Sequence, residues 1–180
     1  EDVLCIRVLL PKEAPEKFRD LNYLCSEVDR ADRRWDARTA RSLICSLPNE
    51  LSLPEWTQIV KTFVERNFLE YNLCAIAAIH EGKNLQDPQR DNPHVHIIVP
   101  TRSIGPNGFD PKKDRTLNQK ARLCQWRADW AQVQNQAYEH SGLPIRVSHE
   151  SLERQGIYDR EPTIHLSHID WQREMAGERT

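Results

Sequence analysis

The chain has 180 residues, of which 38% are hydrophobic and 29% are charged, and its formal net charge at pH 7 is −2. This length and balance predict one globular domain, and the net charge gives no overall attraction to nucleic acid. No run of 18 apolar residues and no basic and apolar leader is visible, so we expect no membrane span and no secretion signal. The cysteines, none in a Cys-x-x-Cys pair, favour a reduced cytoplasmic protein with small buried thiols at Cys5, Cys25, Cys45, Cys74 and Cys124.

The first half of the chain predicts two strands and two helices. Residues 3–10 and 40–48 are short β-type apolar runs, each ended by a proline, and we predict a strand in each. Residues 18–39 carry apolar side chains at helical spacing and predict a helix. The clearest helix lies within residues 50–72, where Ser52 is a good N-cap and a proline fits the first turn.

In the second half, two apolar runs at residues 73–80 and 92–102 are joined by a polar connection, which predicts an antiparallel pair of strands. Residues 103–115 are rich in turn residues. We expect a long helix over residues 117–140 and a short one over residues 148–155. The buried side of the long helix is predicted to carry Leu123, Trp126, Trp130, Val133 and Ala137. Strands and helices without regular alternation predict an α+β fold, with helices packed on a mostly antiparallel sheet.

Two histidines, His94 and His96, stand one residue apart near the start of the predicted strand 92–102. Side chains two apart in a strand point to the same face, so both imidazoles lie on one side. His80 ends the preceding strand, and in an antiparallel pair that end lies beside the start of the next strand. The pattern therefore gathers three imidazoles, and three neutral imidazoles with open positions are a normal site for Zn, Mn or a similar divalent ion.

The alternative for each histidine is a structural role, which is the more common one for a single histidine in a strand. Three imidazoles gathered without a shared ligand would cost desolvation free energy that a core does not recover, so metal binding is the favoured interpretation. A second alternative is an unrelated three-histidine hydrolase that acts through metal-bound water. The one candidate general base beside the histidines for such an enzyme is Glu81.

The residues around the histidines resemble a known signature. AIHEGKN (residues 78–84) and DNPHVHIIVPTR (residues 91–102) are similar to the HUH signature of plasmid relaxases, and more narrowly to the MobA/MobL family of mobilization nickases. Further matching segments occur in the order of that family and extend the resemblance over nearly the whole chain: LPKEAPEKF, RADRRWDARTARSLICSLPNELS, WRADWAQVQNQAYEHSGLPIRVSHESLERQGI and EPTIHL.

The resemblance implies a single relaxase domain over residues 1–180 with an α+β, HUH relaxase-like fold, in which helices pack on the faces of a central, mostly antiparallel β-sheet. It implies that a tyrosine attacks a phosphate at the plasmid origin of transfer, leaving a 5′-phosphotyrosyl link and a free 3′-OH. His80, His94 and His96 match the family's ligands of a divalent metal ion (Mn, Mg or Zn), which polarises the phosphate. Single-stranded DNA, accessory mobilization proteins and a coupling protein are the implied partners, and the bacterial cytoplasm is the implied location.

The chain departs from the family at the nucleophile. The family's tyrosine lies near the N-terminus, in a helical segment that follows a first strand, and no such segment is found in this chain. Tyr23, Tyr71, Tyr138 and Tyr158 remain, and the first three fall in or at the end of predicted helices, where packing is the simpler role. We therefore expect the first strand and the tyrosine-bearing helix to be absent, so that the chain is either a piece of a longer relaxase or an HUH-shaped DNA-binding module without cleavage activity.

A second departure concerns acidic residues. Relatives often carry them in the strand that matches residues 40–48, where this chain has Ser42 and Ile44. Glu27 and Asp36 are the alternatives, although both also suit the surface of a helix.

Predicted DNA contacts come from cations that follow the histidine strand. Arg102 matches the family's arginine and is predicted to contact a phosphate, with a structural salt bridge as the alternative. Lys112, Lys113 and Arg115 lie in a locally basic segment and are predicted to track the phosphates of a single strand, with a solvated loop as the alternative.

Four aromatic or imidazole side chains remain without a predicted part in the chemistry. Trp126 and Trp130 recur four residues apart on a helix, which favours core packing over base stacking. His149 and His165 match positions in the family, and no chemical role follows from the sequence for either one.

Overall fold

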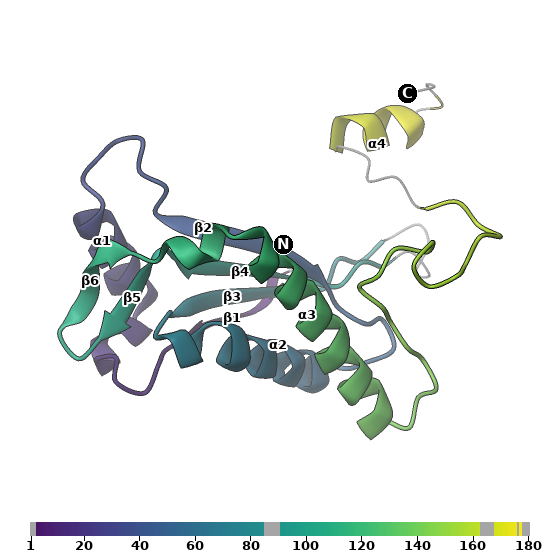
Figure 1. Ribbon diagram of the computed structural model, residues 1–180, viewed down its shortest axis with the longest axis horizontal. Helices are drawn as coiled ribbons and strands as arrows, with labels where there is room; N and C mark the ends of the chain where they lie inside the picture. The colour runs from purple at the N-terminus through teal and green to yellow at the C-terminus, as the bar shows by residue number, and fades with distance from the viewer. Residues whose placement is uncertain (1–2, 85–90, 163–167, 176, 178–180) are drawn as a thin grey trace. The chain divides into compact units, whose positions relative to one another are not determined.

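The structure is a computed structural model that describes residues 3–84, 91–162, 168–175 and 177 (Figure 1). Its elements are, in chain order, β1 (Val3–Leu9), the 3-10 helix η1 (Glu16–Arg19), α1 (Leu21–Ala31), β2 (Ala40–Ser46), α2 (Leu53–Asn67), the 3-10 helix η2 (Leu69–Tyr71), β3 (Ala75–His80), β4 (His94–Pro100), β5 (Arg102–Gly105), β6 (Gly108–Lys113), the 3-10 helix η4 (Arg115–Asn118), α3 (Lys120–His140) and α4 (His168–Met175). The chain packs as two compact units, Glu1–His149 and Glu150–Thr180, and each is described by itself. A single domain over residues 1–180 therefore stays a prediction.

In the first unit, the described strands form a four-stranded antiparallel sheet in the order β1-β3-β4-β2 and a separate hairpin of β5 and β6. The predicted antiparallel pairing of β3 with β4 is confirmed, and it sets His80 opposite His94. At the outer edge of β3, Val3 of β1 lies opposite His80. At the outer edge of β4, Ile44 of β2 lies opposite His96. The register therefore brings one end of all four strands to the histidines.

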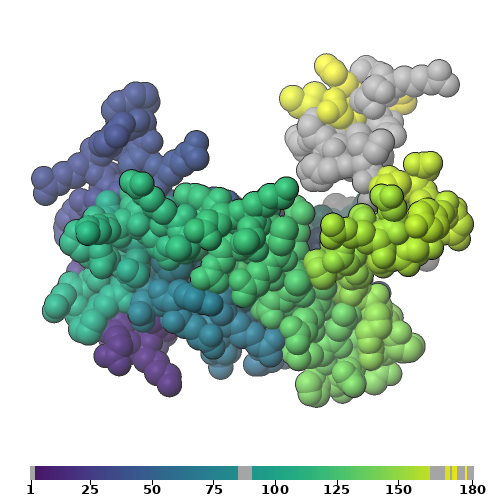
Figure 2. Space-filling view, in the orientation of Figure 1, coloured from purple at the N-terminus to yellow at the C-terminus, as the bar shows by residue number. Residues whose placement is uncertain are grey.

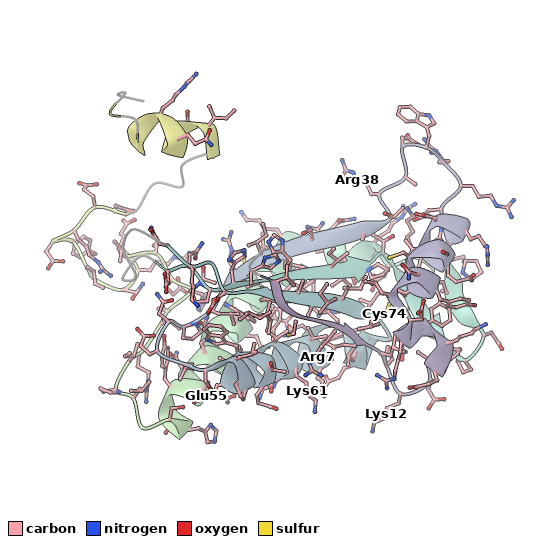
Figure 3. All side chains as sticks on the ribbon, turned by 180° about the vertical axis from the view of Figure 1, so that it is seen from behind. Arg7, Lys12, Arg38, Glu55, Lys61 and Cys74 are labelled. Atoms are coloured by element: carbon pink, nitrogen blue, oxygen red, sulfur yellow. The ribbon has the colours of Figure 1, made fainter. Side chains whose placement is uncertain are left out.

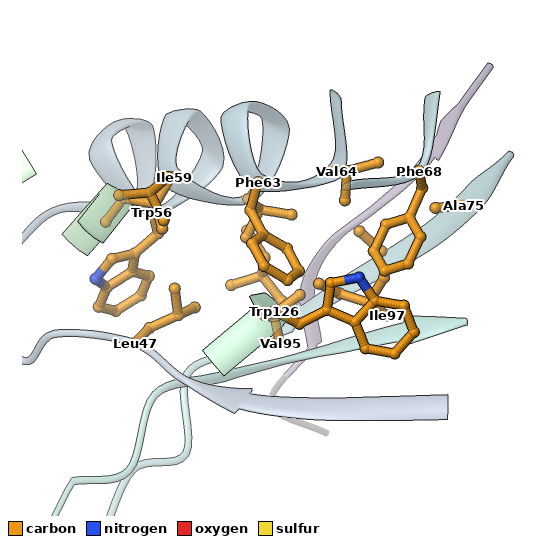
Figure 4. Close-up of a cluster of buried hydrophobic side chains, with 14 of the residues drawn as sticks. Leu47, Trp56, Ile59, Phe63, Val64, Phe68, Ala75, Val95, Ile97 and Trp126 are labelled. Carbon is orange, nitrogen blue, oxygen red and sulfur yellow. The ribbon is translucent and has the colours of Figure 1, made fainter. Parts of the chain in front are cut away.

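One face of the sheet is buried beneath α2 and α3 (Figure 1). Alternate residues of β3 and β4 point into this interface and are almost fully buried, and Phe63 of α2 packs against them. Figure 4 shows the cluster, in which Trp126 reaches across from α3. The predicted core role of both tryptophans is confirmed, because Trp126 is buried and the ring of Trp130 packs edge-on against Phe63 at 5.0 Å. Burial of each large apolar side chain contributes about 1.5–3 kcal/mol.

The other face of the sheet carries the histidines at one end and a second apolar cluster at the other. That cluster packs η1 and α1 against the far ends of β1 and β3 and against the β5–β6 hairpin, through buried Phe18, Leu24, Cys74 and Ile104. Between the two ends, Ile44 and Ile98 are exposed. The predicted α+β architecture, with helices on a central antiparallel sheet, is confirmed.

The start of α2 shows the predicted capping at Ser52. The Glu55 carboxylate accepts hydrogen bonds from the Ser52 backbone N–H at 2.7 Å and from the Ser52 hydroxyl at 2.6 Å. Its other oxygen accepts from the Ser141 hydroxyl at 2.5 Å, which ties α2 to the end of α3. These bonds, with the one from Ser141 first, lower the pKa of Glu55 to about 2.

This low pKa makes the stability of the fold depend on pH in the acidic range. A carboxylate whose pKa is lower in the folded state than its ordinary value of about 4.3 contributes stability that is lost as the pH falls through the folded pKa of about 2. We expect the free energy of unfolding, measured in urea across this window, to fall less steeply in Glu55→Gln than in the wild type. Glu65→Gln, which removes an exposed charge from the same helix, should keep the wild-type slope, and identical slopes in all three proteins would refute the role of Glu55.

The predicted helix over residues 18–39 is shorter than expected. α1 ends at Ala31, and residues 32–39 form a loop with a turn at its tip. At this point the backbone of Asp32 leaves the helical conformation (φ −118°, ψ 80°), and its side chain binds Arg102 and Lys113, which lie far away in the sequence. The segment 103–115, expected only to contain turns, forms the β5–β6 hairpin around them.

The second unit differs more from the sequence-based expectation. The predicted helix over residues 148–155 is wrong: residues 152–156 form turns, in which the Gly156 N–H donates to the Glu153 carbonyl at 3.0 Å and the Ile157 N–H donates to the Leu152 carbonyl at 2.9 Å. Few apolar side chains are available there to hold a helix against a core. α4 was not expected. Residues 163–167, which include His165, lie outside the described residues.

The five cysteines are free. Burial raises the pKa of Cys74 to about 12 and that of Cys45 to about 11, as expected for small apolar groups inside the fold. Cys25 and Cys124 are exposed, so the prediction of burial is wrong for these two. None of the helices in the described part of the chain combines the length and the apolar character that a membrane span requires.

Candidate metal centre

Three imidazoles gather where β3 ends and β4 begins. The ring centroid of His80 lies 5.0 Å from that of His94 and 4.9 Å from that of His96, and the remaining pair is 5.2 Å apart. The predicted convergence is therefore confirmed, and it follows from the register that sets His80 opposite His94. Metal binding by the three rings stays a prediction.

A backbone carbonyl selects the tautomer of one neutral imidazole ring. The Nδ1 atom of His94 lies 2.7 Å from the carbonyl oxygen of Asn92. Because a carbonyl only accepts hydrogen bonds, Nδ1 carries the proton, and Nε2 keeps its lone pair for a ligand. A bond of this kind on the second nitrogen is the usual support of a metal-binding histidine.

Gly82 holds that carbonyl in position. The backbone N–H of Asn92 donates to the carbonyl of Gly82 at 2.9 Å, which closes the connection between β3 and β4 at its base. A Cβ atom at residue 82 would lie 2.0 Å from the Asn92 oxygen, and its φ of +60° also favours glycine. Sequence reasoning missed both residues, although a glycine two residues after His80 was a signal of close backbone approach.

Three imidazoles are a suitable set of ligands for a divalent ion, although their ring nitrogens do not converge on a common point in this structure. Within the described residues, no group of three or more His, Cys, Asp or Glu side chains is arranged to hold a metal ion as it stands. The rings nevertheless lie about 5 Å apart, and the Cβ–Cγ torsion of histidine has broad energy wells. Small ring rotations would turn the free nitrogens toward a shared ion, so the three residues fit the group that the sequence implies.

Carboxylates do not occur at the β2 positions where the family resemblance leads us to expect acidic residues. Ile44, directly opposite His96, is 68% exposed, and Ser42 follows on the same face. Asp36 lies beyond the far end of β2, where it binds Arg34, and Glu27 of α1 binds Arg30. The structure therefore does not bring either alternative acid to the histidines.

Glu81 directly follows His80 in the chain, and its carboxylate forms an ion pair. Its carboxylate binds the Lys83 ammonium at 2.7 Å. A base held in an ion pair is poorly placed to accept a proton from water, which weakens the alternative of a hydrolase.

The tyrosines of the first unit are engaged away from the imidazoles. Tyr23 packs edge-on against Phe18 in the second apolar cluster, and the ring of Tyr71 lies 4.2 Å from the Arg122 guanidinium. Tyr138 is buried and donates its hydroxyl to Glu50 at 3.2 Å. Burial first, and then the negative charge of Glu50, raise the pKa of Tyr138 to about 12, which opposes its use as a nucleophile. Tyr158 belongs to the second unit and is exposed.

Two of the four predicted DNA contacts take part in a buried ion-pair network. Asp32, whose side chain is only 4% exposed, binds Arg102 at 2.6 Å and Lys113 at 2.9 Å. Arg102, 13% exposed, also donates to the backbone carbonyls of residues 31, 110 and 111. Its geometry is that of the structural salt bridge considered as the alternative. The network joins the end of α1 to the β5–β6 hairpin.

The other two predicted contacts, Lys112 and Arg115, line a basic cleft of about 1070 Å³. This cleft lies at the end of β2 and β4 opposite to the histidines, beside Arg102 and Lys113. It also includes Arg38, just before β2, and Arg41, near the start of β2. Sequence reasoning missed both because they lie about 70 residues from Lys112 and Arg115 in the chain. DNA binding by these residues stays a prediction.

Comparison with known proteins decides the family. The model of the MobA/MobL family matches residues 1–174. The chain belongs to the MobA/MobL family. The predicted resemblance and its HUH relaxase-like fold are thereby confirmed.

Curated relatives of this MobA/MobL chain include proteins named for mobilization and conjugal transfer. The probable mobilization protein MobA of Bifidobacterium longum is 29% identical over 219 residues, which cover 98% of this chain and 37% of that protein. The conjugal transfer protein TraA of Agrobacterium fabrum is 28% identical over 188 residues, 88% of this chain and 16% of that protein. Mobilization protein A of Escherichia coli is 30% identical over 179 residues, 85% of this chain and 24% of that protein. The MobA/MobL chain thus spans little more than a third of these relatives at most.

A solved structure shares the fold. It comes from work on the molecular basis of vancomycin resistance transfer in Staphylococcus aureus, and it is 29% identical to the MobA/MobL chain with a TM-score of 0.74. The match covers 84% of this chain and 77% of the other.

Proposed function

We propose that this chain is the relaxase domain of a mobilization protein, which nicks single-stranded plasmid DNA at an origin of transfer and so initiates conjugative mobilization. The observation that carries the proposal is the gathering of three imidazoles, about 5 Å apart, on the exposed end of the sheet in a MobA/MobL chain. Relatives named for mobilization and conjugal transfer support it.

In the proposed reaction, a tyrosine oxygen attacks the scissile phosphorus and the bond from phosphorus to the 3′ oxygen breaks. The 5′ phosphate remains on the tyrosine, and the leaving 3′ oxygen takes up a proton. His80, His94 and His96 would hold a divalent metal ion (Mn, Mg or Zn), which when bound supplies Lewis-acid stabilisation of charge on the phosphate. Asn92 keeps the His94 ring in the tautomer that offers Nε2.

The nucleophile is proposed to be none of the four tyrosines of this chain. Tyr138 is buried with a raised pKa, and Tyr23 and Tyr71 are packed against other side chains. Tyr158 lacks any neighbour that would activate it among the contacts of the described residues. A relaxase tyrosine would then be supplied by a segment outside these 180 residues. Accessory mobilization proteins and a coupling protein are the further proposed partners.

The test is covalent capture of labelled DNA. The protein is incubated with Mn²⁺ or Zn²⁺ and a pool of single-stranded oligonucleotides labelled at the 3′ end, because the 3′ fragment is the one that stays on the tyrosine. We expect binding without an adduct on a denaturing gel for the 180-residue chain. Where the gene encodes residues before Glu1, a chain that includes them should form the adduct and release the 5′ fragment.

Each other outcome has a clear meaning. An adduct on the 180-residue chain that one Tyr→Phe change removes would assign the nucleophile to that tyrosine and refute our exclusion. Binding without an adduct in every form would support the second candidate, a DNA-binding module without cleavage activity. A protein that neither binds nor cuts single-stranded DNA would refute the proposed function.

A further inference from the structure

An exposed tryptophan stands at the tip of the loop between α1 and β2. Trp35 is 98% exposed, more than any other large apolar side chain in the described residues. We call residues 32–39 the tryptophan turn; it projects from the first unit at the upper left of Figures 1 and 2. Single exposed apolar residues are common, so this exposure alone has no functional meaning. The contacts that order the turn and the cations near it give the exposure of Trp35 a functional meaning.

The tryptophan turn is ordered by its own contacts. The backbone N–H of Ala37 donates to the carbonyl of Arg34 at 3.0 Å, and the Arg34 guanidinium binds both oxygens of Asp36 at 3.0 and 2.7 Å. At its base, the Thr101 N–H donates to the Thr39 carbonyl at 2.9 Å. An indole displayed on an ordered turn loses little conformational entropy when a flat partner stacks on it.

Cations without protein partners lie in the turn and in the basic cleft that Arg38 connects to it. Among the described residues, the side chains of Arg33, Arg38, Lys112 and Arg115 have no ion pair or hydrogen-bond partner. Arg38, Lys112 and Arg115 line the basic cleft, and Arg38 lies at the base of the turn (Figure 3). The positive charge is therefore local, although the chain as a whole is slightly acidic.

The cleft and the histidines are joined by one strip of surface. Ala40 and Ser42 of β2 line the cleft, and their face of the sheet continues through Ile44 toward the imidazoles. β4 rises about 3.3 Å per residue, so its far end at Pro100 lies about 20 Å from His94. At the 3.4 Å per nucleotide of a stacked strand, that distance corresponds to at most about six nucleotides, and an extended single strand spans it with fewer.

We propose that the tryptophan turn and the basic cleft form a second contact for single-stranded DNA, a few nucleotides from the scissile phosphate. An unpaired base stacks on Trp35, and the neighbouring phosphates bind Arg33, Arg38, Lys112 and Arg115. This assignment rests on the proposed function, because its distance from the scissile phosphate is counted from the histidines. It differs from the contact predicted for Arg102 and Lys113, because both of those side chains already bind Asp32.

Trp35→Ala tests the stacking contact. We expect binding of an oligonucleotide of about 20 nucleotides, measured by fluorescence anisotropy, to weaken by about 5- to 100-fold, as for the loss of one stacked base. Trp35→Phe should restore most of the affinity. The melting temperature should not change, because the indole makes no buried contacts.

The phosphate contacts are tested by salt dependence. Arg38→Ala combined with Lys112→Ala should reduce the slope of log affinity against log salt by about 1.4, or about 0.7 for each lost contact with a single strand. Lys12→Ala combined with Lys61→Ala removes the same charge from sites away from the cleft, as Figure 3 shows, and should leave the slope unchanged.

The measurements are repeated in a His94→Ala and His96→Ala background, so that the second contact is judged apart from the metal centre. The same Trp35 effect there supports the inference. DNA binding that neither Trp35→Ala nor the cleft variants weaken would overturn it and leave the proposed function intact. Absence of DNA binding in the wild type would count against the proposed function itself. A Trp35→Ala variant that loses a protein partner and keeps its DNA affinity would assign the turn to a protein interface instead.

Discussion

Replacement of both His94 and His96 by alanine is expected to abolish stoichiometric uptake of a divalent metal ion. Loss of one outer hydrogen bond to a metal ligand typically weakens affinity 10- to 100-fold, so loss of two of three ligands should weaken it by more than about 100-fold. An all-imidazole donor set suits Zn²⁺ better than Mg²⁺, which prefers oxygen ligands. Isothermal titration with Zn²⁺ and Mn²⁺, followed by metal analysis of the dialysed protein, measures the effect.

His140→Ala is the matched control, because it removes an exposed histidine at the end of α3. Its metal uptake should equal that of the wild type. In a form of the protein that forms the DNA adduct, the double variant should also cut at least about 100-fold more slowly, the loss typical of one group that stabilises charge in the transition state. A double variant that keeps a stoichiometric ion would show that the imidazoles are not its ligands.

Asp32→Ala is expected to destabilise the fold by about 3 kcal/mol. The change leaves Arg102 buried without its carboxylate, and removal of one partner from a buried pair typically costs about 3–5 kcal/mol. We take the lower end because Lys113, the second cation, is partly exposed and can turn to solvent. Urea denaturation at neutral pH measures the difference.

The pKa of Asp32 indicates the same balance. Burial by itself raises that pKa, but the hydrogen bonds and charges of Lys113 and Arg102 outweigh burial, so the pKa is lowered. The ion pairs therefore stabilise the fold at neutral pH, and this stability is lost as the pH falls below the ordinary aspartate value of about 3.9.

Asp36→Ala removes a half-exposed carboxylate a few residues away and should cost at most about 1 kcal/mol. Equal losses in the two variants would refute the structural role assigned to Asp32.

The histidine cluster could be predicted because it depends on local periodicity. A period of two places His94 and His96 on one face, and antiparallel pairing of neighbouring runs then brings His80 to them. The start of α2 could be predicted for the same reason, since the interaction of Ser52 with Glu55 lies within four residues.

The errors involve contacts that no local pattern encodes. α1 ends where Asp32 binds Arg102, 70 residues further along the chain, and helical spacing alone extended the helix to residue 39. The β5–β6 hairpin was missed because the segment 103–115 is rich in turn residues, which indicated a loop. Gly82 and Asn92 support the site through backbone atoms, whose positions the side-chain pattern does not reveal.

The place of Val3 opposite His80 has a consequence for how a nucleophile could reach the site. An extended chain spans at most about 3.3–3.6 Å per residue, so a residue joined to β1 through five others would stay within about 20 Å of the imidazoles. Tethering of this kind gives an effective concentration in the millimolar range. A tyrosine on a segment continuous with β1 would thus meet the phosphate by an intramolecular encounter, whereas the same tyrosine on a separate peptide would need millimolar concentrations to compete.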